Sequence, residues 1–225
     1  MTTSKFTYCQ INPLDHEEAL NLFWNDFMPH EPASRLAGCC TKTGYRIHNL
    51  DNMLREMLKN NMCYTANDEK GELAGVIFCT IYFQTKNNST KLFTKEEFIH
   101  QGWPADFSEV LLLLQELSPF SKIMTTKKTD KILDLFAIVV KNKFRRQGIA
   151  TQLISCALDK AKSLKIPLVN ITCTSSFTQR CSIKLEFSKE NSILYKDWKC
   201  KDQIIGQENI DPVHSVAVSY LKFVT

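Results

Sequence analysis

The segment that decides the fold is Ile132-Leu133-Asp134-Leu135-Phe136-Ala137-Ile138-Val139-Val140, which leads through Lys141-Asn142-Lys143-Phe144 into Arg145-Arg146-Gln147-Gly148-Ile149-Ala150. Its first part is apolar and β-branched and lies between two lysines, which predicts a buried strand over 132–140. Apolar residues then recur at helical spacing over 149–164, which predicts a helix. A strand, a basic turn with a glycine and a helix N-terminus therefore follow one another directly.

This turn is a predicted phosphate site. Backbone N–H groups converge at a helix N-terminus, the helix dipole adds positive potential, and Gly148 lets a ligand approach the backbone. The side chains of Arg145 and Arg146 can close over the same oxygens. A solvated basic turn is the alternative from these residues alone. The sequence contains neither G-x-x-x-x-G-K-[ST] nor G-x-G-x-x-G, so a P-loop and a dinucleotide fingerprint are excluded.

The overall composition fits one α/β domain over residues 1–225. The chain is 44% hydrophobic and 23% charged, as is usual for a globular protein, and its length suffices for one well-buried core or, at a stretch, two small ones. The net charge of +4 suits a small anionic ligand and is too dispersed for a nucleic-acid binder. We expect the lysine-rich runs 122–131 and 141–146 to concentrate positive charge around the strand.

The cysteines indicate a reducing compartment. There are nine, an odd number, and no C-x-x-C pair occurs, so free thiols are a simpler account than a disulfide framework or a zinc site. The N-terminus lacks an apolar signal-like run, and no stretch approaches the ~20 apolar residues that span a bilayer. We therefore expect a cytoplasmic protein without a metal site or a membrane contact, and a monomer.

Further periodic segments predict the rest of a mixed sheet. A strand at 6–11, a helix closed by Pro29 and an amphipathic helix over 47–58 precede a hairpin of strands 63–66 and 73–83. Residues 30–46 are expected to be irregular and 84–125 to form a variable insertion region with a helix over 109–117. Strands at 168–173, 192–198 and 213–223 and a short helix over 177–185 follow. The order predicts a mixed α/β fold, with about seven strands in a central sheet and helices on both faces.

The turn motif also carries a resemblance. Arg-x-x-Gly-x-Ala after a hydrophobic strand resembles the pyrophosphate-binding turn of the GNAT superfamily of N-acetyltransferases, with Arg145, Gly148 and Ala150 in the three defining positions. The resemblance implies that acetyl-CoA is the co-substrate. It further implies that the backbone of Ile138, Val139 and Val140 pairs with the pantetheine arm, and that the pyrophosphate is bound by Arg145, Arg146, Gln147, Gly148, Ile149, Ala150 and Thr151.

A second segment resembles the insect-type arylalkylamine (dopamine) N-acetyltransferase branch of that superfamily. Acetylation of an amine needs a proton acceptor near the substrate, and Phe27-Met28-Pro29-His30-Glu31-Pro32 is similar to the Phe-x-x-x-Glu-Pro stretch of that branch. The resemblance implies that Glu31 is the catalytic base. From chemistry alone, a solvated loop glutamate is the alternative. His30 stands where the branch commonly has aspartate.

The segment 173–180 resembles the serine-rich segment of the same branch. By spacing, Thr174 and Thr178 take the places of two functional serines, which implies that their hydroxyls support the acetyl end. The alternative is that residues 174–176 only cap the following helix. Two departures stand out. Glu186 replaces a glycine of the family pattern, and Ser182 stands where many members have a tyrosine acid, so the thiolate takes its proton from water or from Ser182.

The implied function is transfer of the acetyl group from acetyl-CoA to a small arylalkylamine, of the dopamine, tyramine, tryptamine or serotonin type, by direct attack. One alternative is a polyamine or a hydrazine-like or aliphatic amine as acceptor, and another is a catalytically weak acetyl-CoA-binding module. A polyamine would need extra carboxylates, for which Glu31, Asp106 and Glu109 are candidates. His214 is a candidate at the border of the amine pocket. Four aromatic residues are candidates for its lining, although such residues are more often core: Phe27, Tyr45, Trp103 and Phe107.

Overall fold

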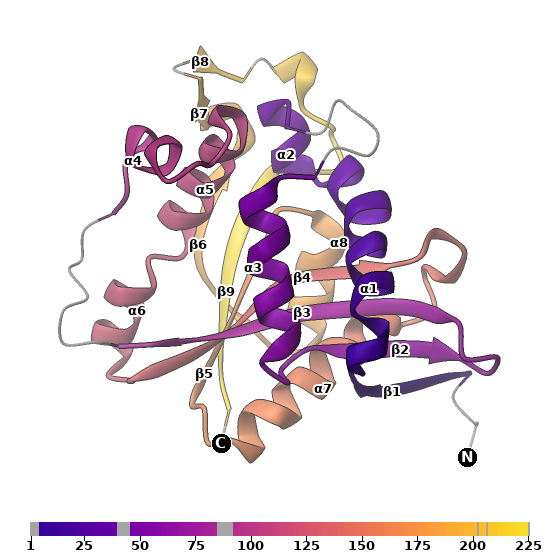
Figure 1. Cartoon of the computed structure of the whole chain (residues 1–225). Helices are drawn as coiled ribbons and strands as arrows, with labels where there is room; N and C mark the ends of the chain where they lie inside the picture. Colours follow the sequence, from indigo (N-terminus) through magenta and orange to yellow (C-terminus); the bar gives the residue numbers. More distant parts are fainter. Residues whose placement is uncertain (1–4, 40–45, 85–91, 202, 206, 225) are drawn as a thin grey trace.

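The computed structural model describes residues 5–39, 46–84, 92–201, 203–205 and 207–224. Its centre is a twisted seven-stranded sheet in the order β1-β2-β3-β4-β5-β9-β6 (Figure 1). Only β4 and β5 pair in parallel, so the sheet is mixed, and the predicted seven strands are confirmed. The strands are β1 (Phe6–Gln10), β2 (Tyr64–Asp68), β3 (Leu73–Phe83), β4 (Lys131–Val140), β5 (Leu168–Cys173), β6 (Ser188–Leu194) and β9 (Val216–Phe223).

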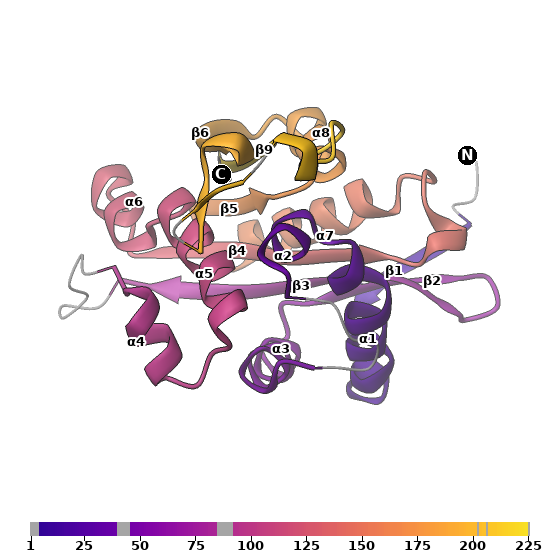
Figure 2. The same cartoon turned by 90° about the horizontal axis from the view of Figure 1, so that it is seen from above.

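Helices cover both faces of this sheet. One layer holds α1 (His16–Leu22), α2 (Pro32–Ala37), α3 (His48–Lys59) and α5 (Ala105–Leu117), and the opposite layer holds α7 (Ile149–Ser163) and α8 (Ser176–Lys184). Figure 2 shows α1 and α3 on one side of the strands and α7 and α8 on the other. Each layer buries its own hydrophobic cluster against the sheet, as expected for an amphipathic helix on a sheet face.

Several short elements differ from the sequence prediction. The segment 30–46, expected to be irregular, contains α2, and the expected insertion 84–125 contains α4 (Lys95–His100) and α6 (Phe120–Lys127) as well as an α5 that begins four residues early. A two-stranded ribbon, β7 (Lys199–Cys200) with β8 (Gln203–Ile204), was also missed. These elements carry too few apolar residues for a periodic signal. Helix α4 is instead fixed by a capping box between Thr94 and Glu97.

The edge strand β6 was predicted at the wrong place. It spans Ser188–Leu194 rather than 192–198 and pairs only with β9. Its first residues, Ser-Lys-Glu-Asn, are polar and mostly exposed, so the apolar alternation that marks a half-buried strand is absent.

A β-bulge divides β4 into two halves, and it reverses which face of the sheet the odd-numbered side chains occupy. Ala137 pairs with Phe78 and Leu135 with Cys79, so Phe136 is the extra residue. The side chain of Leu135 packs in the α7 layer, whereas that of Ala137 packs in the layer of α1 and α3. A strict alternation along 132–140 therefore does not hold.

The parallel pairing of β4 with β5 is short. It covers three pairs, of which the last is Asp134 with Asn170. Beyond that pair β4 continues along β3, and β5 continues along β9. The C-terminal half of β4 therefore has an edge that β5 does not cover.

The expected concentration of positive charge around β4 needs correction. Lysines 122–131 lie on α6 and at the start of β4, about 33 Å along a ten-residue strand from the turn that follows it. At the turn itself, Lys141 forms ion pairs with Glu18 and Glu72, and Lys143 pairs with Glu72. Much of the predicted positive charge is thus either distant or neutralised.

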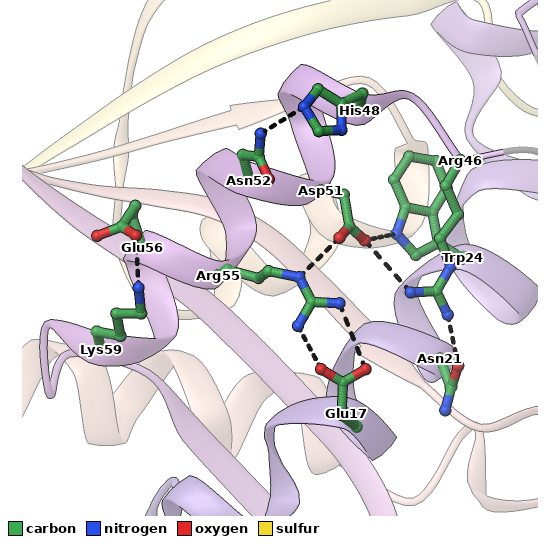
Figure 3. A network of polar contacts seen from close by, with 10 residues as sticks. All are labelled: Glu17, Asn21, Trp24, Arg46, His48, Asp51, Asn52, Arg55, Glu56 and Lys59. Carbon is green, nitrogen blue, oxygen red and sulfur yellow. Dashed lines mark hydrogen bonds and ion pairs between the residues drawn. The ribbon is translucent and has the colours of Figure 1, made fainter.

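A polar network fixes the end of α1 to α3 (Figure 3). The carboxylate of Asp51 on α3 accepts hydrogen bonds of 2.8 Å from the indole N–H of Trp24 and from Nε of Arg55, which also pairs with Glu17. Burial tends to raise the pKa of Asp51, but the bonds from Arg55 and Trp24 outweigh it and leave that pKa below its usual value. Trp24 lies in a π-helical turn over Phe23–Phe27, so the network holds the segment that leads to Glu31.

Eight cysteines lie in the described part of the chain, and all eight are free thiols; Cys40 lies outside it. Within the same part, no helix has the length and apolar character needed to cross a bilayer. The described residues also form no cluster of His, Cys, Asp and Glu that would hold a metal ion.

Candidate active site

The turn between β4 and α7 presents backbone donors to solvent. Gly148, with φ +82°, is the N-cap of α7, and this helix start has no side-chain cap. Arg146 also has a positive φ, of 62°, so two of three successive residues adopt a left-handed backbone conformation. A Cβ placed at Gly148 would meet no atom within 4 Å. The first-turn N–H groups of α7 therefore face open space, which fits an oxyanion such as a diphosphate.

The guanidinium of Arg145 does not lie over this turn. Its Nε donates to the carbonyl of Val140 at 3.2 Å, and its Nη2 donates to the carbonyl of Asp26 at 3.5 Å. Arg145 thus joins the end of β4 to the last turn of the α1 segment. Arg146 and Gln147 are exposed at the turn. Of the two arginines, Arg146 has the freer side chain for a phosphate.

The uncovered edge of β4 presents two of the three predicted backbone positions. Lys141 N–H donates to the carbonyl of Ala74 on β3. The Val139 carbonyl also points toward β3, because a Cβ built on Gly75 of β3 would lie only 2.8 Å from it. Backbone groups of alternate residues point to opposite edges of a strand. Ile138 and Val140 therefore direct their N–H and C=O groups to the side from which β5 has separated, and Val139 does not.

Glu31 is a buried N-cap rather than a solvated loop residue. It is 6% exposed, its Oε1 accepts from the N–H of Ala33 at 3.0 Å, and its Oε2 accepts from that of Ser34 at 2.5 Å. Pro32 occupies the first position of α2, where its missing N–H is harmless. An ionised carboxylate has about four acceptor positions, so two remain for a proton or a water molecule.

The two threonines lie at the start of α8. Thr174 directly follows β5, and Ser175, not Thr174, caps the helix by accepting from the N–H of Phe177. The carbonyl of Thr174 accepts a 2.8 Å hydrogen bond from the hydroxyl of Tyr195. Thr174 and Thr178 are half-buried, and since Ser175 supplies the side-chain cap of α8, capping does not account for their hydroxyl groups.

Tyr195 supports the candidate site, and sequence reasoning missed it. It is fully buried, and burial first, followed by the negative charge of Glu31 and by Cys173, raises its pKa well above the usual value. Tyr195 therefore stays neutral, and its hydroxyl holds the carbonyl of Thr174. Nothing in the sequence marks it, because it follows a polar edge strand in a one-turn helix, Tyr195–Asp197.

Ser182 lies deep in the protein. It is 0% exposed, and its hydroxyl contacts the carbonyl of Thr178 at 3.1 Å and the thiol of Cys173 at 3.4 Å. Its geometry gives no support to a role as a proton donor. Nearby, the hydroxyl of Thr151 on α7 donates to the sulfur of Cys181 at 3.5 Å, which joins α7 to α8.

The glycine missing from the family pattern has a structural consequence. Glu186 adopts φ +59°, a left-handed conformation that side chains other than glycine disfavour. The chain thus keeps the turn that the glycine would ease and accepts strain there.

A cavity of about 410 Å³ opens between α2 and the part of the chain that connects β6 to β9. His214 on its wall accepts a 3.2 Å hydrogen bond from the N–H of Ser176 at Nδ1 and packs edge-on against Phe177. Glu31 lies between two lining residues but does not line the cavity itself. The lining consists of His30, Pro32, Arg35, Leu36, Cys200, Lys201, Gln203, Ile205, Asn209, Asp211 and His214.

Of the four candidate aromatic residues, the three in the described part of the chain do not line this cavity. Phe107 is buried in the core and stacks on Trp103 at 5.6 Å between ring centroids, and Phe27 stacks on Phe23 at 4.9 Å. Tyr45 lies outside the described residues. The aromatic side chains thus serve mainly to pack the layer of α1 and α5.

The turn and the uncovered strand edge fit the diphosphate and the arm of a CoA thioester. The chain belongs to the acetyltransferase (GNAT) family, whose model matches residues 18–182, and acetyl-CoA is therefore its co-substrate. No curated protein sequence matches significantly.

Solved structures show the same fold. Arylalkylamine N-acetyltransferase 2 from Aedes aegypti has a TM-score of 0.85 at 21% identity, with 98% of this chain and 99% of that one covered. The Drosophila melanogaster polyamine N-acetyltransferase, which forms N-acetylagmatine, has a TM-score of 0.78 at 16% identity, with 97% of this chain and 99% of that one covered. Arabidopsis thaliana NAA60 in complex with acetyl-CoA has a TM-score of 0.55 at 12% identity, covering 97% and 98%.

Proposed function

We propose that this protein acetylates the primary amine of a small arylalkylamine in the cytoplasm, where its free thiols would stay reduced. Acetyl transfer follows from the family, whereas the acceptor is our inference. Enzymes named for arylalkylamines and for polyamines share the fold, so the fold does not discriminate between these acceptors. The charges around the cavity of α2 do.

The observation that carries the proposal is the pairing of two candidate carboxylates with lysines. Asp106 pairs with Lys201 at 2.8 Å, and Glu109, which is buried, pairs with Lys95 at 2.5 Å. Neither carboxylate is left to attract a second cationic group of a substrate. A polyamine carries at least two positive charges at neutral pH and would need such a group.

The lining itself favours an acceptor with a single amine. It contains Arg35 and Lys201 as cations and Asp211 as a carboxylate, which already accepts from the N–H of Val213 at 2.9 Å. Pro32, Leu36 and Ile205 supply the apolar contacts that an aromatic ring would make. Because Asp106 compensates Lys201, and Arg35 balances the charge of Asp211, such a wall offers no surplus negative charge to a polycation and accommodates a ring with one amine.

The residues of the site divide the work of transfer. Bound acetyl-CoA supplies a thioester carbonyl that a neutral amine can attack. Glu31 accepts the proton of the amine, directly or through a water molecule. The amide C–N bond forms as the thioester C–S bond breaks, and the CoA thiolate leaves and takes its proton from water. The hydroxyl groups of Thr174 and Thr178 hydrogen-bond the acetyl end, and Tyr195 fixes the backbone that carries Thr174. Arg146 and the α7 N-terminus hold the diphosphate.

The experiment that tests this proposal follows release of the CoA thiol with tyramine, dopamine, tryptamine and serotonin against histamine, agmatine, spermidine and hydrazine. We expect kcat/KM for the first four to exceed that for agmatine and spermidine by at least about fivefold, since one uncompensated charge is worth about 1 kcal/mol or more. A preference for agmatine or spermidine would overturn the acceptor assignment. Tight binding of acetyl-CoA without turnover on any amine would indicate a catalytically weak binding module.

A further inference from the structure

A buried polar network lies where β4, β5, β9 and the end of α5 meet. Asp134 on β4 is 6% exposed and accepts a 2.7 Å hydrogen bond from Nδ2 of Asn170 on β5. Oδ1 of Asn170 accepts from the hydroxyls of Ser118 and Ser219 at 3.3 and 3.2 Å. The hydroxyl of Ser118 also lies 2.8 Å from that of Thr172. The reaction outlined above assigns no role to these groups.

The position of this network in the sheet is specific. Asp134 and Asn170 form the last of the three pairs between β4 and β5, and the strands separate directly after them. Their side chains are thus joined at the vertex of the opening. Ile138 and Val140, whose backbone groups face the opening, lie four and six residues farther along β4, about 13 and 20 Å away.

A buried carboxylate at this vertex is not explained by stability alone. An apolar pair of similar volume is often as stable as a buried polar pair or more so, because the polar groups must give up water. A hydrogen bond between two short side chains is directional, however, and it forms in one register only. A shift of β4 by one residue would turn Asp134 to the α7 face and break the bond.

We propose that Asp134 and Asn170 form a clasp that fixes the point at which β4 and β5 separate, and that it thereby positions the free edge of β4 for the arm of acetyl-CoA. Both are positioning residues, because neither belongs to the edge or the turn that would contact the ligand. The bulge at Phe136 lies between the clasp and that edge. The clasp therefore also anchors β4 just before its bulge.

The test measures acetyl-CoA binding by calorimetry without an amine, so its outcome does not depend on the acceptor. Asp134→Ala and Asn170→Ala break the clasp from either strand, and each is expected to raise the Kd about tenfold, the equivalent of one lost hydrogen bond. Asp134→Asn keeps an acceptor for Asn170 and is expected to bind within about twofold of the parent. The KM for acetyl-CoA should rise in the alanine variants while the KM for the amine stays the same.

Ser118→Ala is the matched control. It removes a hydroxyl that contacts Asn170, Thr172 and Ser219 and leaves the Asp134–Asn170 bond in place. We expect it to lower the unfolding temperature without a change in Kd. Folded alanine variants that bind as tightly as the parent, or a Ser118→Ala variant that binds as weakly as they do, would overturn the proposal.

Failure of the alanine variants to fold would leave Asp134→Gln against Asp134→Asn as the deciding comparison. Both carry an amide, but glutamine is longer by one methylene group and would force the two strands apart. We expect about tenfold weaker binding in the glutamine variant. Equal affinities in these two variants would show that the vertex does not position the ligand.

Discussion

The hydroxyl of Tyr195 donates a 2.8 Å hydrogen bond to the carbonyl oxygen of Thr174. This bond joins the turn after the edge strand β6 to the link between β5 and α8. The negative charge of Glu31 contributes, after burial, to raising the pKa of Tyr195 above its usual value. The proposed acetyl-binding threonine is thus held by Tyr195, whereas the proposed base is held by the N–H groups of Ala33 and Ser34.

Tyr195→Phe should lower kcat about tenfold, because the buried carbonyl of Thr174 loses its donor and the start of α8 can shift. Binding of acetyl-CoA to the α7 turn should change little. Steady-state kinetics and calorimetry measure the two effects. Tyr220→Phe serves as control, because it removes a hydroxyl from a buried tyrosine in the α7 layer. Its kcat is expected to stay within about twofold of the parent value. Equal effects of the two substitutions would contradict a role for Tyr195 in the site.

Glu31→Gln separates the two roles of this residue. Glutamine keeps an oxygen that can accept from one of the α2 N–H groups, so the loss of stability should be about 1 kcal/mol or less. It cannot accept the amine proton, so kcat at neutral pH should fall by about 10²-fold or more. Thermal unfolding and the pH–rate profile are the measurements. An unchanged profile in the variant would remove Glu31 from the role of base.

Gly148→Ala should weaken acetyl-CoA binding about tenfold, because a side chain at φ +82° strains the turn and a methyl group intrudes on the space before the α7 N–H groups. Gly71→Ala is a close control. Gly71 has φ +81°, and a Cβ placed on it would meet no atom within 4 Å, but it lies in the β2–β3 turn. Both variants should lose similar stability, and only Gly148→Ala should bind acetyl-CoA more weakly. Weaker binding in both would point to strain alone.

Lys201→Met should increase the relative use of polyamines. It removes the partner of Asp106 and a positive charge from the cavity wall, so kcat/KM for spermidine relative to tyramine should rise about fivefold, in keeping with about 1 kcal/mol for an exposed pair. Lys196→Met, which frees Asp197 at a similarly exposed place outside the lining, controls for a general change of charge. An unchanged ratio would show that this pair does not set the acceptor preference.

Asp134 should make stability fall as the pH rises. Burial raises its pKa to about 7, against the lowering effect of Asn170, and its charge in turn helps to raise the pKa values of Tyr82 and Cys79 on β3. The folded protein therefore holds a proton that the unfolded chain loses near pH 3.8. The stabilisation is complete below that pH and is lost as the pH approaches 7.

Between pH 5.5 and 8.5 this loss amounts to about 2 kcal/mol. Asp134→Asn, which cannot ionise, should lack this part of the pH dependence and gain stability relative to the parent protein at pH 8.5. Urea unfolding at both pH values measures the difference. Parallel pH dependence in the two proteins would show that Asp134 does not titrate in this range.

The sequence by itself predicted the features that depend on local pattern. The apolar run 132–140, the glycine of the basic turn and the helical periodicity after it are adjacent in the chain, so the strand, the turn and α7 follow from them, as does the family. Glu31 and Thr174 were predicted as site residues from resemblance, and their roles stay predictions. Local pattern failed at α2, α4 and α6 and at the polar edge strand β6, where few apolar residues are spaced regularly.

Only the tertiary structure decided what lies beside what. The Tyr195–Thr174 bond, the Asp134–Asn170 clasp and the Asp106–Lys201 pair each join residues at least 20 positions apart, and no local periodicity encodes such contacts. The same holds for Arg145, whose side chain was predicted to cover a phosphate but lies on the carbonyls of Val140 and Asp26. Chain neighbours determine secondary structure through backbone sterics and periodic burial, whereas these contacts depend on how the strands and helices pack.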